Sequence, residues 1–228
     1  MRLITGGPVV EIFRAEQSLS LLNVIGLLAN EINASNYGEV FGTVQSLSID
    51  RLILSITKLY EVPNRYPLKS IPGILKYFDE NSENLEITEP YLLNDQLRRL
   101  GLFMECFEDF DKNKKNIFVH YKMNYLLSKI NQDEAIKSLK IHRDKKISHP
   151  EDTLVESLPK ISWVSIEGLL SAAKNIVGII GDGYLSSSFM IDSDYLLSND
   201  ATRVGRGLAR ILSDLGINTS EKSERSRT

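Results

Sequence analysis

Several residue types and patterns on which particular folds depend are rare or missing in this sequence. Its 228 residues include one cysteine, Cys106, so an intrachain disulfide is excluded and a reducing compartment is favoured. We expect this thiol to be buried as a small apolar side chain. No apolar run reaches the roughly 18 residues of a membrane span, and the first eight residues lack the apolar core of a signal peptide. These absences predict a cytoplasmic protein that makes no membrane contact.

Charge of one sign is not in excess either. The formal net charge of −3 argues against broad adhesion to nucleic acid or to an anionic membrane, although it leaves room for a small basic cleft. The apolar fraction of 42% is enough for one sizeable core. We therefore expect a single domain over residues 1–217. Residues 218–228 contain no apolar side chain and are expected to form a disordered tail.

Apolar residues recur at steps of three and four along most of the chain, which is the spacing of one face of a helix. Nowhere does a period of two persist long enough to predict a strand. All seven prolines fall between the expected helices or in a first turn. The pattern therefore predicts an all-α protein, folded as a helical bundle. The expected helices cover residues 9–33, 40–59, 72–78, 88–107 with Thr88 as N-cap, 118–130, 132–148, 166–184 and 204–215.

Short polar or glycine-containing stretches are expected to join these helices. The polar run 111–116 is typical of a helix end, and residues 181–183 are typical of a turn. Residues 202–207 hold two glycines and two arginines but follow no strand, so we interpret them as the start of a helix rather than as a phosphate-binding loop. Gly216 is expected to end the last helix.

The most chemically distinctive stretch covers residues 141–150, which hold two of the three histidines and a run of cations. Asn131 and Glu134 have the spacing of a helix N-cap and its capping box, so this helix should begin directly after Asn131. Pro150 disfavours helical geometry at the residue before it, so the helix should end at about Ser148.

Arg143 falls within the apolar stripe of this helix. The stripe follows steps of three, four and four and consists of Ile136, Leu139, Arg143 and Ile147. An always-charged guanidinium at that place needs an anionic partner. In one reading, Arg143 and His149 converge on an anionic ligand. In the other, Arg143 forms a buried ion pair with a carboxylate of a neighbouring helix, and His149 caps the helix end.

The same residue types suit cleavage of a phosphodiester without a metal, which needs a cation at the phosphate and a group that titrates near neutral pH. Under this hypothesis Arg143 holds the phosphate oxygens, His149 transfers a proton at the 2′-hydroxyl or the leaving oxygen of RNA, and Asp144 orients one of them. The surrounding side chains that we expect to contact RNA or phosphate are Lys140, His142, Lys145 and Lys146.

No metal or other cofactor is expected. His142 and His149 are seven residues apart, which is about 10 Å along a helix and too far for two ligands of one ion. The i, i+4 histidine spacing of helical zinc sites is absent.

Residues 143–149 read Arg-Asp-Lys-Lys-Ile-Ser-His and resemble the signature of the HEPN superfamily (higher eukaryote and prokaryote nucleotide-binding domains), in which an arginine and a polar residue precede a histidine. The resemblance is closer to its abortive-infection U-type branch (AbiU-like), in which a closing histidine lies near a helix end. Residues 48–60 and Trp163, which opens the next helix, are similar to the flanking segments of that branch. Together these pieces cover roughly residues 9–184.

The resemblance implies a HEPN-type bundle with additional helices that forms a homodimer, so that two pairs of Arg143 and His149 face a shared cleft. Catalytic members are metal-independent endoribonucleases, so RNA is the implied substrate, in phage defence or in a toxin–antitoxin system with any antitoxin on a separate chain. Many active members carry Asn where this chain has Asp144, which puts a carboxylate beside the phosphate site. Noncatalytic members imply the alternative, a nucleotide-binding or protein-interaction module.

Overall fold

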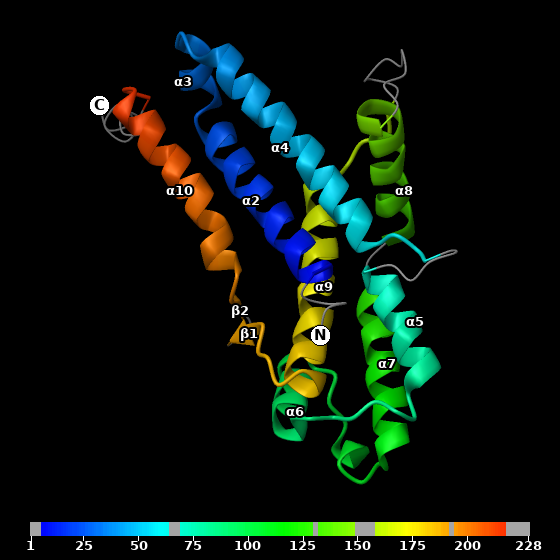
Figure 1. The fold of residues 1–228 in the computed structure, drawn as a ribbon. Coiled ribbons are helices and arrows are strands. Elements are labelled where there is room, and N and C mark those ends of the chain that lie inside the picture. The colour runs from blue at the N-terminus through cyan, green and yellow to red at the C-terminus, as the bar shows by residue number, and fades with distance from the viewer. Residues whose placement is uncertain (1–5, 64–68, 130–131, 149–157, 192–193, 218–228) are drawn as a thin grey trace, which may run out of the picture. The chain divides into compact units, whose positions relative to one another are not determined.

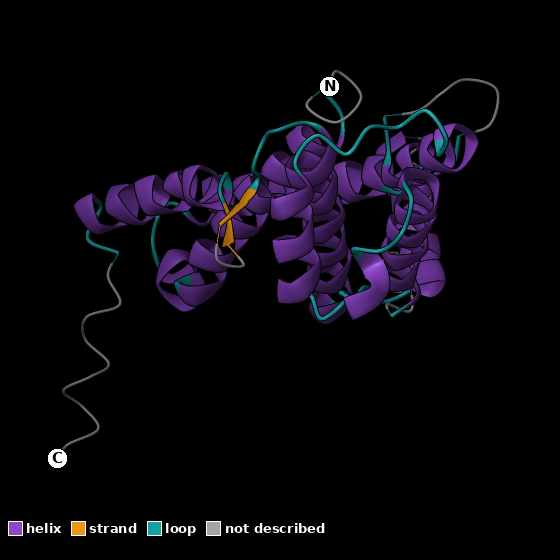
Figure 2. Cartoon of the chain, turned by 90° about the horizontal axis from the view of Figure 1, so that it is seen from below, coloured by secondary structure: helices purple, strands orange, loops and turns teal. Residues whose placement is uncertain are grey.

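Helices make up nearly all of the regular structure, which confirms the predicted all-α class. The computed structural model describes residues 6–63, 69–129, 132–148, 158–191 and 194–217. Its α-helices, shown in Figure 1, are α2 (Pro8–Leu27), α3 (Ala29–Ala34), α4 (Gly38–Leu59), α5 (Ile71–Asn81), α6 (Pro90–Arg99), α7 (Lys112–Ser128), α8 (Gln132–His142), α9 (Trp163–Tyr184) and α10 (Ser198–Asp214). Two further elements are the 3-10 helix η1 (Glu105–Phe107) and the π-helix η2 (Arg143–Ser148). Within these ranges the only strands are β1 (Met190–Ile191) and β2 (Asp194–Tyr195), an antiparallel pair drawn in orange in Figure 2.

The chain divides into two compact units. The first comprises Met1–Ile12 and Ile53–Leu196, and the second comprises Phe13–Leu52 and Leu197–Thr228. The division falls within α2 and within α4, so each of these helices contributes residues to both units. The single domain expected over residues 1–217 stays a prediction, and the tail predicted over 218–228 lies outside the described residues.

Helix α9 forms the core of the first unit. Its apolar residues follow the spacing that predicted it, most of them are buried, and it packs against α6, α7 and α8. By length and hydropathy α9 would also suffice to cross a membrane, contrary to the expectation that no segment is long and apolar enough. However, 61% of its most apolar window is buried inside the protein. That burial identifies α9 as a core helix.

Glycines near the end of α9 allow neighbouring segments to approach its backbone. A Cβ atom at Gly183 would lie 3.0 Å from Leu93 Cδ1, and one at Gly181 would overlap with the ring of Phe189. The prediction of a turn at residues 181–183 is therefore wrong. These glycines belong to the helix, and their missing side chains leave the space that the neighbouring side chains fill.

Helix α6 ends earlier than predicted, at Arg99 instead of near Phe107. Gly101 has a φ of +65°, a left-handed conformation that favours glycine. The N–H of Leu102 donates to the carbonyl of Leu97 at 2.8 Å, as in the Schellman motif that closes many helices. The chain turns away at this point, so the residues up to Phe107 form the separate turn η1.

The polar run 111–116 begins a helix instead of ending one. Asp111 Oδ1 accepts a hydrogen bond from the backbone N–H of Lys114 at 2.9 Å, which makes Asp111 the N-cap of α7. The same hydrogen bond holds the pKa of the Asp111 carboxyl below its ordinary value.

Cys106, expected to be buried, is exposed, because it lies on the outer side of η1 while Phe107 points into the protein.

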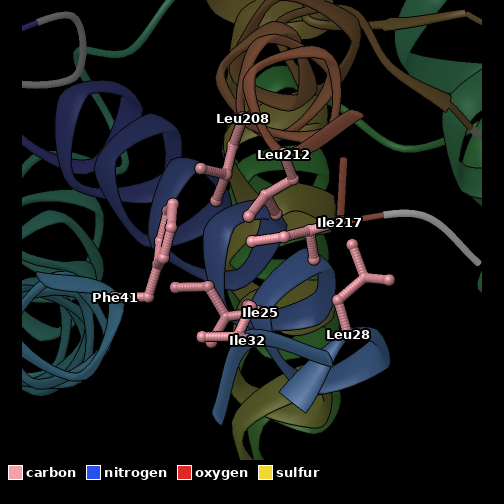
Figure 3. Close-up of a cluster of buried hydrophobic side chains, with 7 residues drawn as sticks. All are labelled: Ile25, Leu28, Ile32, Phe41, Leu208, Leu212 and Ile217. Carbon is pink, nitrogen blue, oxygen red and sulfur yellow. The ribbon is translucent and has the colours of Figure 1, made fainter. Parts of the chain in front are cut away.

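The second unit is built around an apolar cluster. Figure 3 shows seven buried side chains meeting there from α2, α3, α4, α10 and the residues beside them. They are Ile25, Leu28, Ile32, Phe41, Leu208, Leu212 and Ile217. The helix predicted over residues 9–33 is interrupted at Leu28, whose φ of −112° and ψ of 19° depart from helical values and separate α2 from α3. Gly216, with a φ of +79°, follows the end of α10 as predicted.

Two glycines of α10 test this packing, because they differ in the space beside them. A Cβ atom at Gly205 would lie 2.8 Å from the carbonyl oxygen of Ser20 on α2, whereas one at Gly207 would meet nothing within 4 Å. We expect Gly205→Ala to lower the free energy of unfolding by about 1–3 kcal/mol, because backbone atoms must move apart. Gly207→Ala should raise it by up to about 1 kcal/mol, since alanine favours a helix. Urea denaturation would measure both, and equal effects would contradict the close approach at Gly205.

Asp182, in the last turn of α9, provides a test by pH. Its Oδ1 is buried and has no hydrogen-bond partner among the described residues, and burial raises the pKa of its carboxyl above the ordinary value. The folded state therefore binds this proton more tightly than the unfolded chain does. The associated stability is complete below the unfolded pKa and is lost as the pH rises through the raised pKa.

We expect Asp182→Asn to remove that loss, because an amide does not ionise. The free energy of unfolding of this variant relative to the wild type should therefore increase as the pH rises from about 4, the ordinary pKa of an aspartate, through the raised pKa of Asp182. Urea denaturation at a series of pH values would measure the difference. A difference that stays constant over this range would show that the pKa of Asp182 is not raised.

Candidate functional site at Arg143

The charged motif follows α8 as a π-helical segment. Helix α8 spans Gln132–His142, within the helix predicted over 132–148, and Leu139 is fully buried where α8 packs against α9. From Arg143 to Ser148 the chain winds as the π-helix η2. Because a π-helix has more residues per turn, the rotation of about 100° per residue that the sequence analysis assumed does not apply there. Short π-helical segments are frequent at functional sites. Asn131, the predicted N-cap, lies outside the described residues.

Arg143 is held by two carboxylates. Its Nε donates to Asp144 Oδ1 at 2.7 Å, and its Nη1 lies 3.8 Å from Glu61 Oε1. Glu61 comes shortly after the end of α4, so a residue distant in the sequence reaches the motif. The anionic partner that the sequence required for Arg143 is thus present within the chain. One of the two partners, Asp144, is its own neighbour.

Both ion pairs remain open to solvent. The side chain of Arg143 is 23% exposed, that of Glu61 is 45% exposed and that of Asp144 is 54% exposed. Pairs at such exposure contribute about 0–1 kcal/mol each, so they differ from the buried ion pair that one reading of the sequence anticipated. A phosphate can therefore compete with these carboxylates for the guanidinium, which binds phosphate oxygens through two parallel hydrogen bonds.

A cavity of about 560 Å³ opens beside the motif, lined by α5, α7, α8 and the segment that follows α4. Most of its walls are apolar, and Asn124, Lys137, Lys140 and Asp144 supply polar groups. Among the described residues, no carboxylate lies within ion-pair distance of Lys137 or Lys140. The cavity therefore combines apolar walls with two ammonium groups that form no ion pair with a described carboxylate, although Asp144 also lines it.

The other predicted contact residues differ in their surroundings. His142 Nε2 lies 2.7 Å from the carbonyl oxygen of Pro159. Because a carbonyl oxygen only accepts, Nε2 carries the hydrogen, and His142 ties the end of α8 to the segment before α9. Lys145 and Lys146 are exposed on η2, where a phosphate backbone can reach them. His149 lies outside the described residues.

The described ranges contain no group of three or more His, Cys, Asp or Glu side chains arranged to hold a metal ion. The expectation that the protein uses neither a metal nor another cofactor stays a prediction. What the described side chains can do is bind an anion at Arg143 and Lys140.

Glu61 and the cavity were not predicted from the sequence. Glu61 lies far from the motif in the chain, and no spacing rule relates the two. The segment 48–60, which resembles the family, stops one residue before Glu61 and was the nearest available signal. Asn124 gave no signal of its own, because a cavity between helices depends on how those helices pack.

A family model relates this chain to known proteins. The HEPN family model described as AbiU2 matches residues 14–203, which is more than half of the 228 residues and includes the motif. The fold and this match define a protein of the HEPN class. Within that class, the chain belongs to the AbiU2 family, as its motif implied. No curated protein and no solved structure matches the chain significantly.

Because its ion pairs are open to solvent, Arg143 should contribute little to the stability of the fold. We expect Arg143→Met to change the free energy of unfolding by no more than about 1 kcal/mol. Leu139→Ala, which empties a fully buried position of α8, should lower it by about 2–5 kcal/mol. Urea denaturation followed by circular dichroism would compare the two variants. A loss from Arg143→Met as large as that from Leu139→Ala would assign Arg143 a structural role instead.

Proposed function

We propose that this protein is a metal-independent endoribonuclease in which Arg143 binds the scissile phosphate and His149 acts as general acid or base. One observation carries the proposal. In a chain of a HEPN family, the guanidinium of Arg143 stands partly exposed at the start of a π-helical segment, where its carboxylate partners are open to solvent. Such a guanidinium remains available to an incoming phosphate.

RNA supplies its own nucleophile for this reaction. A base takes the proton of the 2′-hydroxyl, O2′ forms a bond to phosphorus, and the bond from phosphorus to O5′ breaks as O5′ takes up a proton. The products are a 2′,3′-cyclic phosphate and a 5′-hydroxyl. Arg143 would neutralise the charge that grows on the phosphate oxygens. His149 would transfer a proton, because an imidazole titrates near neutral pH.

One histidine cannot accept the proton of the 2′-hydroxyl and supply a proton to O5′ at the same moment. A homodimer would bring a second pair of Arg143 and His149 to the same cleft, so that one histidine acts as base and the other as acid. The proposed dimer is therefore supported by the number of proton transfers as well as by the resemblance to the family.

Asp144 would set how readily the site accepts RNA. Its carboxylate accepts a hydrogen bond from Arg143 Nε at 2.7 Å, so a phosphate has to compete with it for the guanidinium. Lys140, Lys145 and Lys146 would offset the repulsion between this carboxylate and the incoming phosphate. Affinity for RNA would then depend on the balance between one carboxylate and the cations around it.

The proposed setting is RNA cleavage in the bacterial cytoplasm, either in phage defence or in a toxin–antitoxin system. Membership of the AbiU2 family supports this setting. A nuclease that acts on the RNA of its own cell needs a control, and we assign that control to an antitoxin on a separate chain.

The cavity favours a second candidate function, noncatalytic nucleotide binding. Its apolar walls would suit a nucleobase, and Lys137 and Lys140 would suit the phosphates of a nucleotide. In that case a nucleotide would raise the melting temperature of the protein without being consumed.

The catalytic assignment is tested by cleavage of single-stranded RNA by the purified protein in the presence of a chelator. Arg143→Ala and His149→Ala should each slow cleavage by at least about 100-fold, because the phosphate charge or a proton transfer is no longer assisted.

Asp144→Asn should bind RNA about fivefold more tightly, since Arg143 loses a competing carboxylate.

Matched controls come from residues of the same types elsewhere. Arg203, an exposed arginine whose Nε lies 3.2 Å from Asp200 Oδ1, and His120 on α7 should be replaceable by alanine without loss of cleavage. If Arg143→Ala and His149→Ala cleave as fast as these controls, the nuclease assignment is wrong. An absence of cleavage by the wild type, together with a nucleotide-dependent thermal shift that disappears in Arg143→Ala, would support the second candidate instead.

A further inference from the structure

Helix α7 concentrates positive charge in a protein whose net charge is negative. From Lys112 to Ser128 it contains four lysines and no aspartate or glutamate, and Lys129 follows as its C-cap. Two of the lysines near its start have acidic partners: Lys112 pairs with Glu86 at 3.9 Å, and Lys114 pairs with Asp111 at 3.4 Å. The lysines in the second half of α7 are surrounded differently.

Aromatic and basic side chains share one face of this second half. The stripe consists of Phe118, Tyr121, Lys122, Tyr125 and Lys129. At about 100° per residue these five positions fall within an arc of about 100°. The buried residues of α7 include Val119, Met123 and Leu127, which the same rotation places on the opposite side of the helix. Helix α7 packs against α5 and α9. The two tyrosines and the two lysines therefore lie away from the buried face of α7, whereas Phe118 packs against Phe107 and Phe110.

The lysines of this stripe lie beside rings instead of carboxylates. Lys122 Nζ is 4.9 Å from the ring centroid of Phe118, 5.7 Å from that of Tyr121 and 6.0 Å from that of Tyr125. Lys129 Nζ is 4.6 Å from the ring centroid of Tyr125. In the part of the chain that the structure describes, neither ammonium forms an ion pair. Cation–π contacts at such sites are worth about 0.5–1 kcal/mol, so they hold the cations near the rings and leave their charge uncompensated.

The tyrosine rings are accessible. The side chain of Tyr121 is 63% exposed and that of Tyr125 is 41% exposed. The two residues are four positions apart, so their rings are displaced by about 6 Å along the helix. Exposed rings with uncompensated ammonium groups between them match the composition of surfaces that bind single-stranded nucleic acid, where bases stack on aromatic side chains and cations follow the phosphates.

We propose that this stripe of α7 binds the single-stranded RNA substrate, with bases stacked on Tyr121 and Tyr125 and phosphates paired with Lys122 and Lys129. The inference rests on the proposed function, because RNA is the ligand in both. Paired bases of a duplex present no free face for stacking, so the stripe selects single strands. All its cations are lysines, whose compact charges on flexible stems suit phosphates at variable positions.

The stripe and the Arg143 site belong to the same unit, and a residue beside the stripe lines the cavity at that site. Asn124, which lines the cavity together with Lys140 and Asp144, is about 60° round α7 from Tyr121. A strand held on the stripe can therefore pass the cavity towards Arg143 without leaving the unit. Efficient cleavage would then need an RNA that reaches beyond the two nucleotides flanking the scissile bond.

The first experiment measures binding of a labelled single-stranded RNA by fluorescence anisotropy, in the full-length His149→Ala protein so that the RNA stays intact. Tyr121→Ala and Tyr125→Ala should each weaken binding about five- to hundredfold, which is the effect expected for one stacked base. Tyr121→Phe and Tyr125→Phe should retain it, because the ring remains. Tyr91→Ala, which removes a tyrosine that is 91% exposed on α6, is the matched control and should have no effect. Equal binding by the alanine variants and the Tyr91→Ala control would overturn the proposal.

A second measurement tests the cations. Lys122→Gln and Lys129→Gln should each reduce the slope of log affinity against log salt concentration by about 0.7, since one phosphate contact is lost. Lys76→Gln, which changes an exposed lysine of α5 that pairs with Glu80, should leave the slope unchanged. Unchanged slopes in all three variants would contradict phosphate contacts at the stripe. Displacement of the RNA by polyglutamate, or equal affinity for duplex RNA, would assign the stripe to another partner and overturn the inference.

Cleavage assays separate failure of the stripe from failure of the nuclease assignment. If Arg143→Ala cleaves like the wild type, the nuclease assignment fails, whatever the binding data for the stripe. If Arg143→Ala is inactive but Tyr121→Ala and Tyr125→Ala bind and cleave long RNA like the wild type, only the stripe fails. The result that supports both is loss of cleavage of long RNA in the tyrosine variants, with cleavage of a dinucleotide unchanged.

Discussion

The packing of α9 is the constraint on which the first unit depends. Tyr60, which follows α4, donates its hydroxyl hydrogen to the carbonyl of Leu169 at 2.5 Å, and Tyr184 donates to Asn116 Oδ1 at 2.8 Å. Burial raises the pKa of both phenols, so they remain protonated donors. Through these contacts α9 positions the end of α4 and the first half of α7. Glu61 adjoins Tyr60, so the same contact places its carboxylate near Arg143.

The packing of α9 also determines where the charged side chains of this unit lie. The protein as a whole is slightly acidic, yet Arg143, Lys140 and the lysines of α7 gather basic groups on elements that α9 holds together. Exposed cations can lie near one another at little cost in free energy, because water and salt screen their repulsion. An approaching polyanion is attracted by all of them at once. Asp144 is the exception, since its carboxylate is hydrogen-bonded to the Arg143 guanidinium that the proposed reaction needs.

Much of the fold and the centre of the site could be predicted from local sequence patterns. Steps of three and four between apolar residues located most helices, because burial of one helical face requires that spacing. The same periodicity placed Arg143 among apolar residues and so predicted its need for an anionic partner. The order of residue types from Arg143 to His149 indicated the family, and the family model confirmed it. These features depend on neighbours within a few turns of one helix, which is the range that sequence spacing describes.

Contacts between distant segments were decided only by the tertiary structure. Glu61 approaches Arg143 because the end of α4 and helix α8 both belong to the first unit, and no local pattern contains that information. The glycines at 181–183 have the composition of a turn, but in the structure they allow neighbouring segments to pack closely against α9. The sequence of a helix does not show which segment will pack against it. The sequence by itself determined the all-α class, the position of most helices and the need of Arg143 for an anionic partner. Only the fold determined which carboxylates meet that charge and how open they are to solvent, because burial and screening depend on the packing of elements far apart in the chain.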